Sequence, residues 1–512
     1  MRAVDLLRFF FAAAALAAPF AGCDGGPSLE ELNRVTAVRD PSVDDTAPDA
    51  PFRPGQRRDV GDADATFDAE GWNEFMSAVT MPGDLDGDGI GDLVVWGELP
   101  NPPDIVPCHM GCPGFSQLAI RIIYGSTTLG ADGTLRTDAE LLSWHVNGLR
   151  MSVDAAGDVN GDGLADLVVG VGTSIDDVQG NAFVILGGPR LRGTHDVRDV
   201  GLLLRENGST HFDQVAGLGD VDGDGRDDFA VGATQWPSAE DPRGRLYVYY
   251  GADGEPDRRS EDDASAAITS EGATRFGIAQ AAGDVNGDGR GDFLVREEDE
   301  LGAVIATTWL VLGRAERFAG DVDVASIGTR IDASVVRGLG DLDGDGIDDL
   351  GATADEGARD GFVLWGRPEW PESIVPSEAD TWIDRGEDTR ASGTAARQVL
   401  PAGDVDDDGH PDFFYADPGY GPEGVSRGAA YLFRGALARA SGGHPLSEAT
   451  AFLGQDWHAE NEPDTRRGYD SIGRSIASGS DVNGDGIDDL VLAATSAPDG
   501  GRGYLWLGRR DE

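Results

Sequence analysis

The nonapeptide DLDGDGIGD, which runs from Asp84 to Asp92, recurs in variant form six more times along this chain of 512 residues. The later copies are DVNGDGLAD from Asp158, DVDGDGRDD from Asp220, DVNGDGRGD from Asp284, DLDGDGIDD from Asp341, DVDDDGHPD from Asp404 and DVNGDGIDD from Asp481. Because the copies start roughly sixty residues apart, one structural unit is repeated seven times.

The segments around each nonapeptide have the composition of β-strands. An apolar stretch follows it directly, such as FAVGA from Phe229, and an alternating stretch that ends in Gly comes next, such as RLYVYYG from Arg245. A short apolar segment precedes the nonapeptide, as in FGIAQAAGD from Phe276, and weaker stretches such as AELLSWH from Ala139 can supply a fourth strand. Four antiparallel strands repeated seven times predict an all-β fold, a seven-bladed β-propeller.

The ends of the repeat region predict how the ring closes. The third strand of the seventh unit ends at Gly508, so its outer strand has to come from another part of the chain. The stretch from Asp59 to Asp68 precedes the first inner strand, and we expect it to supply that strand and to cover the sheet edge.

Each nonapeptide places oxygen-bearing side chains at positions one, three, five and nine, with Gly after position five. A cation of the size of calcium takes six to eight oxygen ligands, and a tight loop with Gly at its turn can offer them. Magnesium demands stricter octahedral geometry, and an all-oxygen site is poorly suited to zinc or copper. The alternative is that these Gly-rich loops are only turns, but seven copies in phase favour calcium. We therefore predict up to seven Ca²⁺ ions, one in each blade.

The predicted ligands are the side chains at positions one, three, five and nine and the main-chain carbonyl at position seven. In loops 1 to 7, in chain order, they are Asp84, Asp86, Asp88, Ile90 and Asp92; Asp158, Asn160, Asp162, Leu164 and Asp166; Asp220, Asp222, Asp224, Arg226 and Asp228; Asp284, Asn286, Asp288, Arg290 and Asp292; Asp341, Asp343, Asp345, Ile347 and Asp349; Asp404, Asp406, Asp408, His410 and Asp412; and Asp481, Asn483, Asp485, Ile487 and Asp489.

Composition excludes several kinds of chemistry. The chain has 93 acidic residues against 40 basic ones, a formal net charge of -53, and every basic residue is Arg. Without lysine there is no Schiff-base lysine, P-loop lysine or lysine general base. The negative charge also disfavours a nucleic-acid partner, because binding to phosphates requires clustered cations.

The first 58 residues precede the predicted propeller of residues 59–512. Residues 1–22 have the apolar run of an export signal, and Ala21-Gly22-Cys23 resembles a bacterial lipoprotein cleavage site. That resemblance implies lipidation of Cys23 and anchoring of the protein in a membrane at the cell envelope or surface. The alternative is ordinary signal cleavage and secretion. Residues 23–58 are rich in Pro and Asp, which predicts a disordered tether.

The repeated units resemble FG-GAP repeats, the modules of the integrin α-subunit propeller, over roughly residues 59–512. The resemblance is clearest at Phe276-Gly277 with GDVNGDGRGDF after it. It implies a calcium-binding propeller. Calcium loops in all seven units depart from the integrin pattern, so heterodimer assembly and signalling are not implied.

The connections from second to third strands, and from one blade to the next, lie opposite the calcium loops. The longer ones, at 97–117, 416–428 and 437–469, make that face the expected recognition surface for a protein or glycan, unless they are passive loop expansions. Cys108 and Cys112 lie in the first insertion, where a small disulfide is expected in an exported protein and a metal site with His109 is the alternative.

Two functional hypotheses follow. The first is a calcium-stabilised, surface-anchored module for adhesion or binding, which we expect to be a monomer. The second is a polysaccharide-active enzyme, a lyase or hydrolase, built on a propeller scaffold. We find no catalytic constellation in the sequence, so we expect the protein not to be an enzyme.

Overall fold

The computed structural model divides the chain into two compact units, Met1–Pro48 and Asp49–Glu512. All described residues belong to the second unit. They are 56–59, 63–68, 75–99, 115–129, 131, 133–146, 152–173, 180–205, 212–238, 241–253, 259–271, 275–298, 304–333, 335–356, 359–379, 381–384, 397–420, 428–435, 442–454, 472–495 and 501–510.

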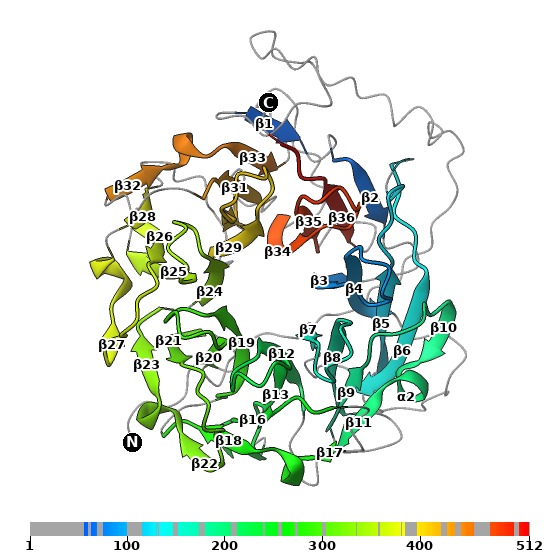
Figure 1. The fold of residues 1–512 in the computed structure, drawn as a ribbon, viewed down its shortest axis with the longest axis vertical. Helices are drawn as coiled ribbons and strands as arrows, with labels where there is room; N and C mark the ends of the chain where they lie inside the picture. The colour runs from blue at the N-terminus through cyan, green and yellow to red at the C-terminus, as the bar shows by residue number, and fades with distance from the viewer. Residues whose placement is uncertain are drawn as a thin grey trace, which may run out of the picture. The chain divides into compact units, whose positions relative to one another are not determined.

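Over the described residues, seven large β-sheets surround a common axis, which confirms the prediction of an all-β, seven-bladed propeller (Figure 1). We number the sheets 1 to 7 in chain order. From the axis outward, sheet 1 contains β3 (Phe75–Gly83), β4 (Asp92–Leu99), β5 (Phe115–Ile123), β6 (Ala139–Val146) and β10 (Gly193–Asp196). Sheet 2 contains β7 (Ser152–Gly157), β8 (Asp166–Thr173), β9 (Gly180–Ile185), β11 (Leu202–Arg205) and β17 (Arg259–Ser260).

The strands of sheets 3 to 5 follow the same order. Sheet 3 contains β12 (Gln214–Gly219), β13 (Asp228–Ala233), β16 (Arg245–Tyr249), β18 (Ala266–Thr269) and β22 (Gly320–Asp323). Sheet 4 contains β19 (Ile278–Gly283), β20 (Asp292–Glu298), β21 (Val304–Val311), β23 (Gly328–Ile331) and β27 (Ser373–Ile374). Sheet 5 contains β24 (Val335–Gly340), β25 (Asp349–Glu356), β26 (Arg359–Leu364), β28 (Thr381–Asp384) and β32 (Gly442–Pro445).

Sheets 6 and 7 take strands from both ends of the repeat region. Sheet 6 contains β29 (Gln398–Gly403), β30 (Asp412–Asp417), β31 (Ala429–Phe433), β33 (Ala451–Gly454) and β1 (Gln56–Asp59). Sheet 7 contains β34 (Ile472–Ser480), β35 (Asp489–Ala494), β36 (Arg502–Trp506) and β2 (Ala65–Asp68). A separate small hairpin pairs β14 (Pro237–Ser238) with β15 (Asp241–Pro242).

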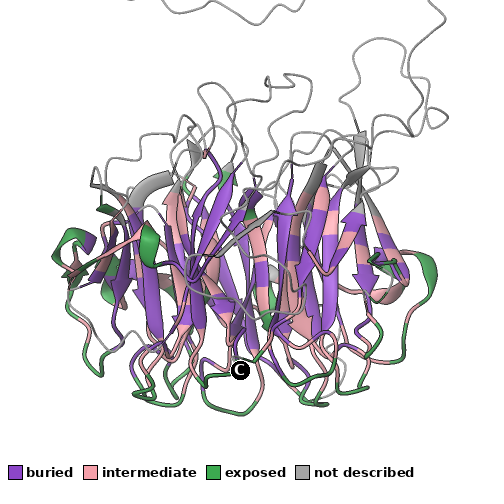
Figure 2. Ribbon diagram, turned by 90° about the horizontal axis from the view of Figure 1, so that it is seen from above, coloured by how far each residue is buried: buried purple, intermediate pink, exposed green. Residues whose placement is uncertain are grey.

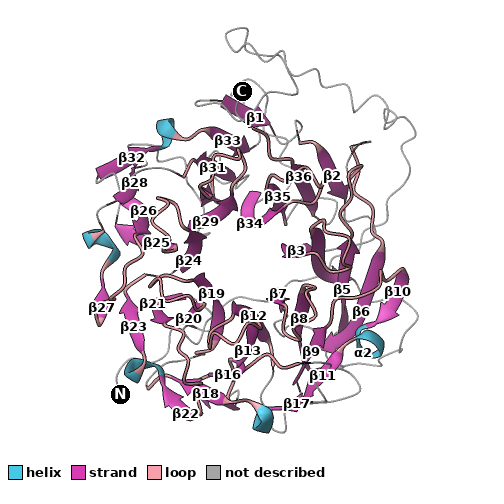
Figure 3. Ribbon diagram, in the orientation of Figure 1, coloured by secondary structure: helices cyan, strands magenta, loops and turns pink. Residues whose placement is uncertain are grey.

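Helices in the described part of the chain are limited to single turns at the outside of the ring (Figure 3). They are α2 (Val197–Val200) and the 3₁₀ turns η2 (Glu261–Asp263), η3 (Val324–Ser326), η4 (Pro376–Glu378) and η5 (Leu446–Glu448).

The hydrophobic core lies between neighbouring sheets. The second strand of each sheet is apolar on both faces because each face packs against another sheet; β13, for example, is buried along its whole length. Buried side chains form seven clusters, and each cluster joins two adjacent sheets, such as Leu246 and Ile268 of sheet 3 with Phe293 of sheet 4. Figure 2 shows the buried strands and, at one end of them, the exposed turns.

A fifth, parallel strand covers the outer edge of sheets 1 to 6. In sheets 1 to 5 it comes from the connection between the third and fourth strands of the following sheet, as when β22 pairs with β18. These strands were not predicted from the sequence. They satisfy the outer hydrogen-bonding groups of each sheet and link each blade to the next.

β1 and β2 complete the two sheets at which the ends of the repeat region meet. β2 pairs antiparallel with β36 and occupies the fourth position of sheet 7, within the stretch expected to supply that strand. β1 pairs parallel with β33 of sheet 6, in the position that a following blade fills elsewhere. β1 therefore lies within the segment predicted to be a tether, because main-chain pairing orders a sequence that has no apolar alternation.

Candidate metal centres

Each repeated nonapeptide forms the loop between the first and second strands of its sheet. In loop 1, the carboxylate of Asp84 accepts hydrogen bonds from the main-chain N–H groups of Gly87 and Gly89, both at 2.7 Å. Gly87 and Gly89 have φ angles of +81° and +84°, which residues with a Cβ adopt at a cost. The loop thus turns sharply around the first carboxylate.

The same turn occurs in all seven loops. In each one, Oδ2 of the position-one Asp accepts from the N–H of the position-six Gly, at 2.6 to 2.9 Å. Oδ1 of the position-five Asp accepts from the N–H at position seven, at 2.9 to 3.1 Å. These bonds give all seven loops the same turn.

The Asp at position nine begins the second strand and is fully buried. In loop 1, Asp92 accepts hydrogen bonds from Leu85 N–H at 2.7 Å and from Gly125 N–H, beyond the third strand, at 2.8 Å. Desolvation by burial, partly offset by these bonds, raises the pKa of Asp92 to about 7. The aspartate therefore ties its loop to the third strand of the same sheet, in addition to any role as a ligand.

Five further sheets repeat both hydrogen bonds of position nine, and in sheet 6 Gly435 N–H donates to Asp412 at 2.8 Å. Burial raises the pKa of the position-nine Asp to about 7 in those five sheets and to about 8 for Asp412, where the nearby Asp406 carboxylate adds to the effect. The other five residues are Asp166, Asp228, Asp292, Asp349 and Asp489.

Carboxylate oxygens come within 4.8 Å of one another in four loops. Three of these groups join positions one, three and nine, and the fourth joins positions one, three and five. They are Asp84, Asp86 and Asp92; Asp220, Asp222 and Asp228; Asp341, Asp343 and Asp349; and Asp404, Asp406 and Asp408. The remaining loops carry Asn160, Asn286 and Asn483 at position three, so an amide oxygen takes the place of the third carboxylate.

Neighbouring loops are also joined by main-chain hydrogen bonds. Gly91 N–H donates to the Asp481 carbonyl at 2.8 Å, and Ala165 N–H donates to the Asp84 carbonyl at 2.9 Å. In the same way, Asp227 N–H donates to the carbonyl of Asp158 at 3.0 Å. The order of one loop is consequently coupled to that of the loop before it.

Basic and aromatic side chains next to the loops were not identified from the sequence. Arg190 reaches the carboxylates of Asp86 and Asp88 in loop 1 from the connection that follows β9 of sheet 2. Arg317, from sheet 4, contacts Asp222 and Asp224 of loop 3 in the same way. The sequence does mark the aromatic residues, because the residue before the Gly that follows the third strand varies with the residue at position three.

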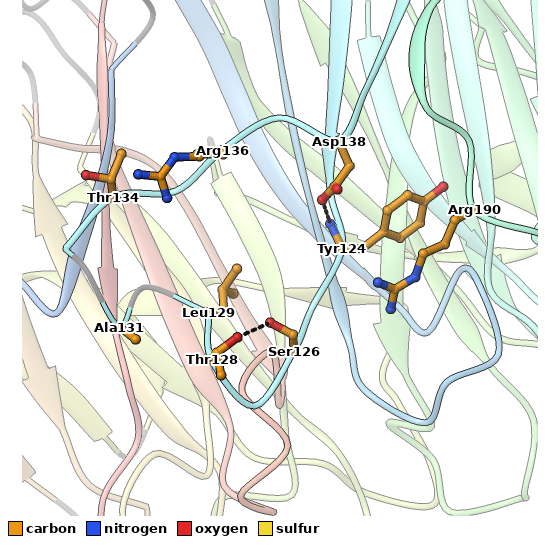
Figure 4. A pocket seen from close by; sticks show the side chains of 9 residues that line it. All are labelled: Tyr124, Ser126, Thr128, Leu129, Ala131, Thr134, Arg136, Asp138 and Arg190. Carbon is orange, nitrogen blue, oxygen red and sulfur yellow. Dashed lines mark hydrogen bonds between the residues drawn. The ribbon is translucent and has the colours of Figure 1, made fainter.

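A pocket of about 420 Å³ lies beside loop 1 (Figure 4). It is formed by the β5–β6 connection together with Arg190, and its lining is rich in hydroxyl and charged groups. The lining residues are Tyr124, Ser126, Thr128, Leu129, Ala131, Thr134, Arg136, Asp138 and Arg190.

Several predicted features lie outside the described residues. These are the export signal, Cys23, the greater part of the tether, Cys108 and Cys112, and most of the three long insertions. Within the described part of the chain, no helix has the length and apolar character needed to cross a membrane.

The fold and its loops define a class, that of seven-bladed β-propellers with an acidic loop between the first two strands of each blade. Two segments of this protein match a known repeat family. A sequence model described as "FG-GAP repeat" matches residues 212–249 and 472–507, which contain loops 3 and 7.

Known proteins with similar sequences include integrin α chains. The protein is 27% identical over 231 residues to integrin alpha-PS2 of Drosophila melanogaster, a match that covers 43% of this chain and 15% of that one. It is 31% identical over 155 residues to integrin alpha-IIb of Homo sapiens, covering 27% and 14% of the two chains. The matches thus span about one seventh of the length of these relatives.

Among solved structures, the fold overlaps with a rhamnogalacturonan lyase of Bacillus licheniformis. The two are 10% identical, and the overlap covers 86% of this chain and 91% of the lyase with a TM-score of 0.30. A score this low supports no inference about activity.

Proposed function

We propose that the protein is a calcium-binding β-propeller in which each of the seven loops binds one Ca²⁺ ion. The observation that carries the proposal is the repetition of one loop conformation seven times, with carboxylates from positions one, three and nine, or one, three and five, converging in four of the loops. The carbonyl at position seven and water would complete a shell of six to eight oxygens.

Electrostatics supports a coupling between calcium and stability. Three or four carboxylates in one loop repel each other unless a cation or hydrogen-bond donors compensate their charge. The position-nine aspartates are buried, and their raised pKa values reflect the cost of ionising them without a metal. A bound calcium ion would lower that cost and stabilise the folded state.

Thermal unfolding with excess EGTA or with calcium tests this proposal. A ligand at a hundredfold excess over its dissociation constant stabilises a protein by about 2.7 kcal/mol per site. With seven sites, we expect the melting temperature to fall by on the order of 10 °C or more in EGTA. A melting temperature that does not respond to calcium or chelator would overturn the proposal.

A matched pair of variants assigns the effect to the loops. Asp224 and Asp253 both form ion pairs with Arg226, but only Asp224 is a predicted ligand. Asp224→Asn should weaken or remove one calcium site in equilibrium dialysis, whereas Asp253→Asn should leave calcium binding unchanged. Equal effects of the two substitutions would show that the loop is not the binding site.

We further propose that the propeller is a surface-anchored binding or adhesion module for a protein or glycan. The similarity to integrin α repeats supports a binding role. Because consecutive strands are antiparallel, the insertions 97–117 and 416–428 leave from the end opposite the loops. The stretch 437–469, expected to be one insertion on that end, contains β33, so only its part after Gly454 leaves from there, while the part before Ala451 leaves from the end that carries the loops. We propose the end opposite the loops as the main binding surface. The pocket beside loop 1 offers hydroxyl and guanidinium groups suited to a sugar and is a second place to test.

A binding screen against glycans and surface proteins, in calcium and in EGTA, tests this role. Stable binding that requires calcium is the expected result. Release of new reducing or unsaturated ends without stable binding would contradict it and indicate a polysaccharide-active enzyme. Anchoring is tested separately, because Cys23→Ser should release the protein from the membrane fraction if Cys23 carries the lipid.

A further inference from the structure

The seven loops fall into two classes according to the residue at position three. Loops 1, 3, 5 and 6 have Asp there, and loops 2, 4 and 7 have Asn. We call them Asp loops and Asn loops. The position-three residues of the Asp loops are Asp86, Asp222, Asp343 and Asp406, and those of the Asn loops are Asn160, Asn286 and Asn483.

A second position in each repeat divides in the same way. The residue before the Gly that follows the third strand is Leu in every Asn loop blade and is aromatic or Arg in every Asp loop blade. These residues are Leu186, Leu312 and Leu507 in the first set, and Tyr124, Tyr250, Trp365 and Arg434 in the second. Agreement across all seven repeats indicates that the two positions act together.

Sheet 1 shows what joins them. Nε of Arg190 donates to Oδ2 of Asp86, and Nη2 of Arg190 donates to Oδ2 of Asp88. The guanidinium carbon lies 5.1 Å from the centre of the Tyr124 ring, and the Tyr124 hydroxyl accepts a hydrogen bond from Leu191 N–H at 3.0 Å. Tyr124 thus holds the arginine by a cation–π contact and fixes the main chain next to it (Figure 4).

Sheet 3 repeats this arrangement with different residues. Nε and Nη2 of Arg317 donate to Oδ2 of Asp222 and Oδ2 of Asp224, the second at 2.7 Å. The guanidinium carbon lies 4.6 Å from the centre of the Tyr250 ring, and the Tyr250 hydroxyl accepts from Phe318 N–H at 2.8 Å. The Asp222 side chain is only 3% exposed, so this contact replaces water around a buried carboxylate.

Loops 2, 6 and 7 compensate position three by different means. In sheet 6, Nε of Arg434 lies 2.9 Å from Oδ2 of Asp406, so the residue that is Tyr in sheets 1 and 3 supplies the positive charge itself. In the Asn loops 2 and 7, the amide donates to the position-five carboxylate, from Asn160 to Asp162 at 3.0 Å and from Asn483 to Asp485 at 3.1 Å.

In loops 1 and 6, four ligand carboxylates face one guanidinium, so their net charge is close to that of the three carboxylates of Asn loop 2. Loop 3 has a second guanidinium, because Arg226 also pairs with Asp224, and in Asn loop 4 Arg290 pairs with Asp288. The arginine differs from a calcium ion in being part of the chain and therefore always present. Its planar fork suits two adjacent carboxylates better than an ammonium group would.

We propose that Arg190 and Arg317 act as built-in counter-ions, which keep loops 1 and 3 ordered without calcium and lower their affinity for it. The inference rests on the proposed calcium binding and adds that the sites are not equivalent. As calcium rises, Asn loops 2 and 7 fill first, and loops 1 and 3 fill at higher concentration. A guanidinium next to two ligand carboxylates opposes the approach of a second cation by Coulomb repulsion.

Hydrogen exchange of the intact protein, followed by mass spectrometry during a calcium titration, tests this loop by loop. In the wild type, peptides that contain Gly484 and Gly486 of loop 7 should exchange fast in EGTA, and those with Gly223 and Gly225 of loop 3 should stay protected. Arg317→Met should speed exchange of loop 3 in EGTA and lower the calcium concentration for half-protection about tenfold.

Arg190→Met should have the same effect on loop 1, and Arg192→Met is its matched control. Arg192 lies two residues away and pairs with Asp138, outside the loop. A purely structural ion pair would instead raise exchange equally in calcium and in EGTA, and that result would overturn the inference. So would a higher calcium requirement in Arg190→Met, because it would mean that the arginine positions the ligands.

Two further outcomes keep the inference testable. If Arg190→Met does not fold, Arg190→Lys keeps the charge without the fork and should show a smaller change in the same direction. If calcium protects no loop of the wild type from exchange, the proposed function itself fails. If calcium protects all loops at one concentration, and that concentration is the same in both Met variants, only the counter-ion role fails.

Discussion

Sheets 3 and 7 have nearly the same structure, although the chain connects their strands differently. The four antiparallel strands of sheet 3 come from one continuous stretch, whereas sheet 7 takes β34, β35 and β36 from one end of the repeat region and β2 from the other. Asp64 N–H donates to the Leu505 carbonyl at 2.9 Å, just as Ser265 N–H donates to the Val248 carbonyl at 3.0 Å in sheet 3. The geometry of a blade thus depends on the packing of its strands and is independent of the order in which the chain supplies them.

The outer edge of sheet 7 is also completed as in the other blades. Thr66 forms a parallel bridge with Thr134 of the β5–β6 connection, at the position where β22 covers β18 in sheet 3. Asp64 holds the junction, because its carboxylate accepts from Leu507 N–H at 2.9 Å and pairs with Arg509. β1 and β2 therefore contribute strands to two neighbouring sheets, 6 and 7.

Truncation of the N-terminal strands is expected to have the largest effect, because it removes the strand by which sheet 7 matches sheet 3. Removal of residues 1–69 deletes β1 and β2, exposes the outer edge of β36 and removes Phe67 and Ala65 from the core between sheets 7 and 1. We expect loss of cooperative unfolding and aggregation, seen by circular dichroism and light scattering. Removal of residues 1–54 keeps both strands and should leave the melting curve close to that of the full chain; equal behaviour of the two truncations would refute the role of β2.

Single core substitutions sharpen the comparison. Phe67 in β2 and Ile268 in β18 hold corresponding outer-strand positions and are both buried. Phe67→Ala should lower the free energy of unfolding by about 3–5 kcal/mol and Ile268→Ala by about 2–5 kcal/mol. Chemical denaturation in calcium measures both. A loss below 1 kcal/mol for Phe67→Ala alone would mean that the non-contiguous strand contributes little to sheet 7.

A smaller effect is expected at the inner strand of sheet 3. The Asp154 carboxylate of β7 accepts from Gly217 N–H of β12 at 3.3 Å, and desolvation by burial raises the pKa of Asp154 to about 6. The folded state therefore binds a proton that the unfolded state has lost between pH 4 and 6. The free energy of unfolding should fall with rising pH in this range, by up to about 3 kcal/mol from this group.

Asp154→Asn imitates the protonated acid and should remove that part of the pH dependence. The variant and the wild type should have similar stability at pH 4, and the variant should be the more stable protein at pH 7. Urea denaturation at both values, in saturating calcium, provides the measurement. A difference in stability that stays constant with pH would contradict the assignment.

The sequence predicted the parts of this fold that repeat. Apolar stretches after each nonapeptide became the second strands, and AELLSWH from Ala139 lies in β6 as expected. The parallel outer strands were missed because they are short, as in Arg259–Ser260, and derive their order from main-chain pairing with another blade. Such pairing leaves no hydrophobic pattern in the sequence.

The loops show the same division between local and distant causes. In loops 1, 3, 5 and 6, three of the side chains that the spacing picks out come close together, because the loop conformation follows from local turns around Asp and Gly. The spacing did not predict that Asp92 also binds Gly125 N–H, or that Arg190 reaches Asp86, since 104 residues separate that pair. The matched variation of position three with the residue before Gly was present in the sequence, and only the contacts explain it.

The parallel strand that a blade contributes to the previous sheet affects how the propeller unfolds. In a linear array of repeats, a terminal unit can unravel while the rest stays folded. Here, a blade that opened would also uncover the edge of its neighbour, and the ring has no terminal blade at which opening could start freely. Unfolding should therefore be one cooperative transition in which all seven blades unfold together.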